Sequence, residues 1–252
     1  MNHGPLVFLG MFVAVMASWL VATVAPHFQF GNQEMVVIEE TGVDYPALRQ
    51  GEARQGAEVY RNQGCVYCHT QQVRSRGEGA DIARDWGKRR TVSRDYLRDE
   101  PPMLGQLRIG PDLANFGTRA TNAPNPYTRI FLKLYDARIE TPGSMMPRYP
   151  SLFETRKLRT SGVASPDALT LPERLAPPAG YEVVPRPEAY QLAQYLLSLH
   201  ADVLFFEVFP PQAPRKATNA VEGVTSTNGL PVTTGSNAAP SAAAGTNRPP
   251  AP

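Results

Sequence analysis

The chain has 252 residues and a formal net charge of +2, and 42% of its residues are hydrophobic and 19% charged. This length allows one domain with a sizeable core plus appendages. The balanced charge, without a long run of Lys and Arg, argues against a nucleic-acid-binding protein. The 25 prolines are about twice the usual share, so much of the chain should be loop or extended segment. Two cysteines are too few for a disulfide framework and instead point to one site.

An apolar segment near the N-terminus is long enough to span a membrane. Between Pro5 and Pro26 there is no charged residue, and Ser18 and Thr23 are the only polar side chains. A helix of this length covers about 30 Å, the thickness of a bilayer core. A cleaved signal peptide is the alternative, but no Lys or Arg precedes the run, which is also longer than a usual signal core. We therefore expect residues 5–26 to form a single uncleaved transmembrane anchor.

The rest of the chain divides into three parts by composition. Residues 27–49 have the character of an extended linker, and residues 50–210 that of a mainly α-helical domain. Apolar residues at helical spacing predict three helices in this domain, and two segments rich in proline or charge are predicted to be irregular. The helices are expected at 50–63, 127–136 and 187–199, and the irregular segments at 70–108 and 155–186. Residues 211–252 carry almost no large apolar side chain, so we predict a disordered tail.

The sequence Cys65-Val-Tyr-Cys68-His69 is the attachment signature of a c-type haem. Each thiol adds across one haem vinyl group, and the two intervening residues separate the sulfurs by a matching distance. His69 is thereby placed under the iron as its first axial ligand. A thioredoxin-like redox pair would require a surrounding βαβ unit, and a zinc site would require a second pair of ligands beyond the three other histidines. A chance occurrence in a core helix is the remaining alternative.

The second axial ligand should be a Met or a His, and a Met opposite His raises the reduction potential. We predict Met146, in the loop 142–147, because a proline follows it and the loop precedes the last helix. Met145 is the nearest alternative. His200 is a third candidate, for a site with two histidines, but at the end of the last helix it more simply acts as a cap.

The ring nitrogen of His69 that does not bind iron needs a hydrogen-bond acceptor, which fixes the ring and raises its basicity. The turn Gly110-Pro111-Asp112-Leu113 offers one through the backbone carbonyl of Pro111. A plain turn before a helix is the alternative interpretation.

Two groups of side chains outside the motif also attract interest. Six cations between residues 84 and 98 could pair with haem propionates or steer an acidic partner, or simply face solvent. Three phenylalanines after the last helix are expected to pack on the domain, with a subunit or membrane contact as the alternative. These residues are Arg84, Lys88, Arg89, Arg90, Arg94 and Arg98, and Phe205, Phe206 and Phe209.

The order of these features resembles a class I cytochrome c, and more narrowly subunit II (FixO-like) of cbb3-type cytochrome c oxidases. The resemblance covers about residues 1–200, and the combinations His-Thr-Gln and Arg-x-Gly-Pro-Asp-Leu are more specific than the haem motif alone. The residues that carry it are Val59 and Tyr60, 64–74, Trp86 and Gly87, Leu104 and Gly105, 108–114 and 144–150. The segment 155–186 and the tail 211–252 exceed the family pattern.

The resemblance implies one covalently attached haem c, with Cys65, Cys68, His69 and Met146 at the haem positions of the family. It implies a single-pass anchor in the bacterial inner membrane and a haem domain on the periplasmic side. It also implies electron transfer from a di-haem cytochrome c subunit or a soluble cytochrome c to the haem–copper catalytic subunit. Since His and Met fill both axial positions, we expect no oxygen chemistry in this chain alone.

Two rival functions share the same haem plan. One is the anchored cytochrome c subunit of a nitric oxide reductase, and the other is a free-standing anchored electron shuttle. The motif at 108–113 and the long segment 70–108 favour the oxidase subunit.

Overall fold

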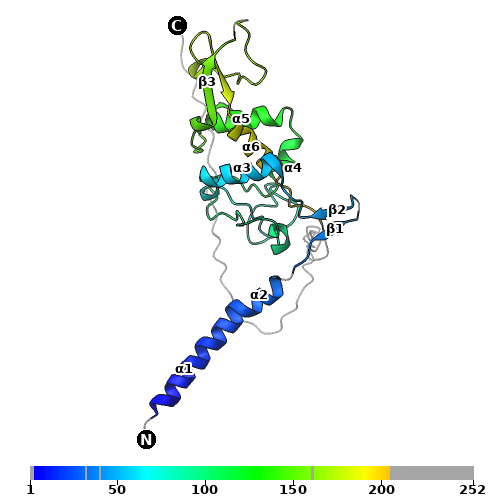
Figure 1. Cartoon of the computed structure of the whole chain (residues 1–252), viewed down its shortest axis with the longest axis vertical. Helices are drawn as coiled ribbons and strands as arrows, with labels where there is room; N and C mark the ends of the chain where they lie inside the picture. The colour runs from blue at the N-terminus through cyan, green and yellow to red at the C-terminus, as the bar shows by residue number, and fades with distance from the viewer. Residues whose placement is uncertain (1–2, 32, 40, 160–161, 205–252) are drawn as a thin grey trace, which may run out of the picture. The chain divides into compact units, whose positions relative to one another are not determined.

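The computed structural model describes residues 3–31, 33–39, 41–159 and 162–204. The predicted disordered tail and the phenylalanines Phe205, Phe206 and Phe209 lie outside these residues. The described part is mainly helical with two small antiparallel sheets (Figure 1). Its helices are α1 Gly4–Trp19, α2 Ala25–Phe30, α3 Gly51–Asn62, α4 Phe116–Thr121, α5 Pro126–Asp136 and α6 Pro187–Leu197, and its strands are β1 Val36–Ile38, β2 Val43–Tyr45, β3 Phe153–Lys157 and β4 Tyr181–Pro185.

The predicted anchor is a helix that starts at Gly4 and continues past Pro26. The span Gly4–Gln29 has a mean hydropathy of 2.3 and no buried residue, so it is long and apolar enough to cross a membrane. Between α1 and α2 the residues Leu20–Val24 form a π-helical turn. Proline has no N–H and its ring crowds the carbonyl four residues earlier. The wider hydrogen bonding just before Pro26 is a usual response to that crowding.

The core of the domain is the crossing of α3 and α6, which lie side by side in Figure 1. The apolar stripe of α6 is formed by Ala189, Leu192, Ala193 and Leu196, and all four residues are buried. Gly56 of α3 permits the close approach, because a Cβ at this position would lie 2.8 Å from Cβ of Tyr195 and would overlap the backbone of Gln191. The rings of Tyr60 and Tyr195 pack beside this crossing with centroids 5.3 Å apart.

The segment 155–186 was expected to be irregular, and this expectation is wrong at both of its ends. β3 pairs with β4 in an antiparallel hairpin whose register runs from Phe153 opposite Pro185 to Lys157 opposite Tyr181. Strands so far apart in sequence pair through long-range contacts, which a local pattern interrupted by prolines does not reveal. The three predicted helices are present within two residues of their expected bounds.

Candidate haem site

One cavity gathers the residues that the sequence singled out. It has a volume of about 470 Å³ and is lined by the end of the motif, the turn around Pro111, helix α5, the loop 141–147 and α6. Four of the five predicted site residues are on its walls, namely Cys68, His69, Pro111 and Met146. Cys65 is not on the walls but is buried in the adjoining hydrophobic core.

The motif Cys65–His69 begins where α3 ends. Gly64 has a φ of 72°, which a glycine adopts without a steric penalty, and it leads the chain into a 3₁₀ turn at Cys65–Tyr67. The amide of His69 donates to the carbonyl of Cys65 at 3.0 Å, so the motif closes one compact turn. Tyr67 is exposed, whereas Cys65 is buried.

His69 is held in its neutral form. Its Nδ1 lies 2.9 Å from the carbonyl oxygen of Pro111, the contact expected for this turn. A carbonyl can only accept, so Nδ1 carries the proton and Nε2 keeps its lone pair. Burial lowers the pKa of His69 below its ordinary value. The imidazole is therefore uncharged at neutral pH, which is the form that binds a metal.

The backbone of the residues around Pro111 is bonded directly to the motif. The amide of Gly110 donates to the carbonyl of Cys68 at 2.9 Å, and the amide of Leu113 donates to that of Thr70 at 2.8 Å. Gly110 also lies against the imidazole, since a Cβ there would be 2.6 Å from Nδ1 and 2.8 Å from Nε2 of His69. The ring of His69 is therefore held in place from behind by backbone atoms.

Asp112 completes this arrangement, and its role was not predicted. Its carboxylate is fully buried and accepts from the Thr70 hydroxyl at 2.6 Å, the Gln72 amide at 2.7 Å and the Ala114 amide at 2.9 Å. A threonine directly after the motif and an aspartate directly after Pro111 were the available signals. Their pairing depends on a contact across 42 residues of sequence.

The two methionines of the loop 141–147 differ in how far they are buried. Met146 is partly buried against the hydrophobic core, whereas Met145 is 79% exposed. The amide of Met146 donates to the hydroxyl of Ser144 at 3.3 Å, which turns the backbone at this point. Both methionines line the cavity, and the greater burial of Met146 favours it over Met145 as a ligand there.

The residues of the cavity fit a haem. The volume of the cavity lies in the range of ordinary cofactor clefts, and its walls are largely apolar. A neutral imidazole, a thioether and a thiol are exposed on these walls. Across the described ranges, no group of three or more His, Cys, Asp or Glu could hold a metal ion. Burial raises the pKa of the Cys65 thiol to about 11. A thioredoxin-like pair needs a low thiol pKa, so this alternative loses support.

The cations between residues 84 and 98 whose contacts are described lie against the domain and the linker, away from the walls of the cavity. Arg89 is buried and donates to both carboxylate oxygens of Asp95 at 2.8 and 2.7 Å, and Arg94 donates to the backbone of Glu34. Arg84 stacks on Trp86 with 5.0 Å between its guanidinium carbon and the ring centroid. Among the described residues that line the cavity, none belongs to this group.

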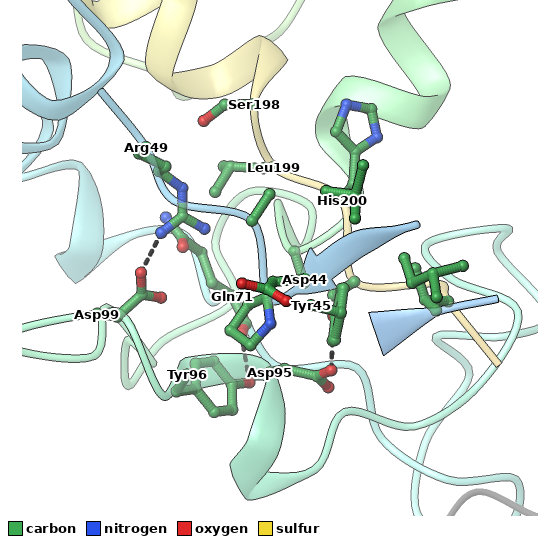
Figure 2. Close-up of a pocket in the computed structure, with 17 residues that line it drawn as sticks. Asp44, Tyr45, Arg49, Gln71, Asp95, Tyr96, Asp99, Ser198, Leu199 and His200 are labelled. Atoms are coloured by element: carbon green, nitrogen blue, oxygen red, sulfur yellow. Dashed lines mark hydrogen bonds and ion pairs between the residues drawn. The ribbon is translucent and has the colours of Figure 1, made fainter. Parts of the chain in front are cut away.

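A second cavity, of about 180 Å³, lies where the linker meets the domain (Figure 2). Tyr45 points toward Asp95, with its hydroxyl donating at 2.7 Å, and Arg49 points toward Asp99. His200 lines this cavity, not the one that contains His69, and its Nδ1 lies 2.9 Å from the hydroxyl of Thr118. This position does not support His200 as an axial ligand, and the hydrogen-bond partner of its Nδ1 is a side chain of α4, not a carbonyl at the end of α6.

Comparisons with known proteins identify the family to which the chain belongs. No curated protein matches the chain significantly. The family model described as cytochrome C oxidase, mono-heme subunit/FixO matches residues 2–170 of the 252. The match covers more than half of the chain and includes the apolar helix, the motif, the turn around Pro111 and Met146. The chain therefore belongs to the FixO family of mono-haem cytochrome c oxidase subunits.

Proposed function

We propose that the chain is the membrane-anchored subunit of a cbb3-type haem–copper oxidase that relays electrons to the catalytic subunit for oxygen reduction. The observation that carries this proposal is the single cavity lined at once by Cys68, His69 and Met146. These residues come from different parts of the sequence, and membership of the family implies a haem cofactor for them to hold. The domain would then be a class I cytochrome c.

Each of these residues has one task toward the haem. Cys65 and Cys68 would hold it covalently through their thiols, and His69 and Met146 would bind its iron. The bound haem supplies one-electron chemistry between ferrous and ferric iron. The carbonyl of Pro111 keeps His69 in the tautomer that offers Nε2, and the apolar walls contributed by α5 and α6 exclude water, which tunes the reduction potential.

The helix Gly4–Gln29 anchors the subunit in the bacterial inner membrane as a single pass, with the haem domain on the periplasmic side. The electron donor is a di-haem cytochrome c subunit or a soluble cytochrome c, and the acceptor is the haem–copper catalytic subunit. With iron bound by both His69 and Met146, this chain would transfer electrons and leave oxygen chemistry to its partner.

Purification in mild detergent from a host that assembles c-type cytochromes tests the assignment. We expect the chain to retain haem on a denaturing gel and to co-purify with a large haem–copper subunit. A chain that purifies alone would be a shuttle, and one that purifies with a nitric oxide reductase subunit would belong to that enzyme. Both results would contradict the proposed function.

Substitutions test the assignment of the ligands. Cys68→Ala should weaken or abolish haem staining on the denaturing gel, because one of the two thioether bonds cannot form. Met146→Leu should remove the sulfur-to-iron charge-transfer band, while the matched variant Met145→Leu keeps it. The reverse result for the two methionine variants would show that Met145 is the ligand.

A further inference from the structure

Asp136 is a buried carboxylate at the end of α5 that is not on the wall of the cavity. Its side chain has no exposed surface, yet three arginines surround it. Its oxygens lie 2.7 Å from Arg148, 3.3 Å from Arg138 and 3.5 Å from Arg174. Its Oδ1 also accepts from the backbone amide of Arg138 at 3.1 Å. The carboxylate of Asp136 therefore contacts three arginines that come from three segments of the chain.

Two of these arginines are connected to Met146, one through the chain and one through a hydrogen bond. Arg148 is two residues after Met146, and Arg138 donates from its Nη1 to the carbonyl of Met146 at 3.4 Å. The backbone of the same loop is joined to α5, since the amide of Tyr149 donates to the carbonyl of Leu134 at 3.0 Å. The loop is thus attached to the end of α5 by both charge and backbone.

The buried position of Asp136 gives these contacts their strength. Burial opposes the charge, but the hydrogen bonds from Arg138 and the close guanidinium of Arg148 outweigh it and hold the pKa of the Asp136 carboxyl below its ordinary value. A buried carboxylate that loses its partner is strongly destabilised. Arg148 therefore cannot leave without a cost to Asp136, whereas a methionine side chain is flexible and does not fix its own backbone.

We propose that Asp136 is a positioning residue, which acts through Arg148 and Arg138 to hold the Met146 loop closed over the cavity. The proposal rests on the proposed function, in which Met146 is an axial ligand of the haem. The ion pair between Asp136 and Arg148 sets the fraction of molecules in which the Met146 loop is open. It thereby sets how readily another ligand replaces Met146 at the iron.

Competition with imidazole on the oxidised, haem-loaded full chain in detergent tests this role. Added imidazole can bind iron only where Met146 has left, so its apparent affinity reports the open fraction. The readout is loss of the sulfur-to-iron charge-transfer band. We expect Arg148→Gln and Asp136→Asn to raise the apparent affinity about tenfold, and Arg148→Lys to restore part of the difference.

Arg174→Gln is the matched control. Arg174 contacts the same carboxylate oxygen and is 52% exposed against 51% for Arg148, but it lies outside the Met146 loop. We expect it to change the apparent affinity less than about twofold, because Arg174 does not belong to the loop that carries Met146. Equal shifts for the two arginine variants, or no shift for Arg148→Gln, would overturn the proposal. Because Arg148 is half exposed, its variant keeps the test decisive even if Asp136→Asn fails to fold.

The same titration separates this proposal from the proposed function. If Met146→Leu abolishes the band and Arg148→Gln behaves as the unmodified chain, the loop is held by other contacts and only the positioning role is lost. If the unmodified chain has no such band, or Met146→Leu retains it, Met146 is not the ligand. The positioning role then falls with the assignment of Met146, whereas co-purification with the haem–copper subunit still tests the proposed function.

Discussion

The two sides of the cavity are held by different kinds of interaction. On the His69 side, formed by residues 64–72 and 104–114, backbone amides bond to backbone carbonyls and to the buried carboxylate of Asp112. On the Met146 side, formed by the end of α5 and residues 141–149, ion pairs with half-exposed arginines carry much of the contact. Buried backbone hydrogen bonds are costly to break, whereas exposed charges can exchange with water. We infer that the His69 side is fixed and that the Met146 side is adjustable.

Replacing one glycine on each side by alanine should give the largest difference in unfolding free energy between the two sides. Gly110→Ala would force a Cβ into the imidazole of His69, so we expect a cost of about 3 kcal/mol or more in unfolding free energy. Gly143→Ala meets no atom within 4 Å and pays only for its positive φ of 81°, about 1 kcal/mol. Denaturant unfolding of the two haem-loaded variants measures both values. Equal costs would mean that the His69 side is not the more rigid one.

Asp112→Asn tests the same side with a smaller change. An amide keeps the shape of the carboxylate but turns one acceptor into a donor, so at least one bond from Thr70, Gln72 or Ala114 is lost. We expect a loss of about 2 kcal/mol in unfolding free energy. Imidazole affinity should stay unchanged within about twofold, because the Met146 loop is untouched. An affinity increase like that expected for Asp136→Asn would show that the two sides open together.

The sequence predicted those parts of the site that depend on local patterns. The motif, the Met-Pro loop, the stripe of α6 and the turn around Pro111 are each contained in a few consecutive residues. Asp112 and Asp136 were missed, because their partners lie in other segments and nothing near either residue marks it as buried. The hairpin of β3 and β4 was missed for the same reason, since each strand becomes recognisable only beside its partner.

That hairpin provides the smallest and most selective prediction, which concerns pH. Glu182 on β4 is 3% exposed, and its carboxylate accepts from the Ser165 amide and hydroxyl, each at 2.7 Å, and from Arg156 at 2.8 Å. These bonds, led by the Ser165 amide, lower the pKa of Glu182 from 4.5 to about 2. A lowered pKa in the folded state means that the contribution to stability is complete above about pH 4.5 and is lost as the pH falls toward 2.

Glu182→Gln should therefore lower the melting temperature at pH 6, and the difference from the unmodified chain should shrink at pH 3. The hairpin follows the Met146 loop directly, and the amide of Arg186 donates to the carbonyl of Leu152 at 2.9 Å at its base. This backbone bond does not involve Glu182, so imidazole affinity at neutral pH should not change. If the affinity does rise, the adjustable side of the cavity extends into the hairpin. The stability of β3 and β4 would then contribute to how firmly Met146 is held.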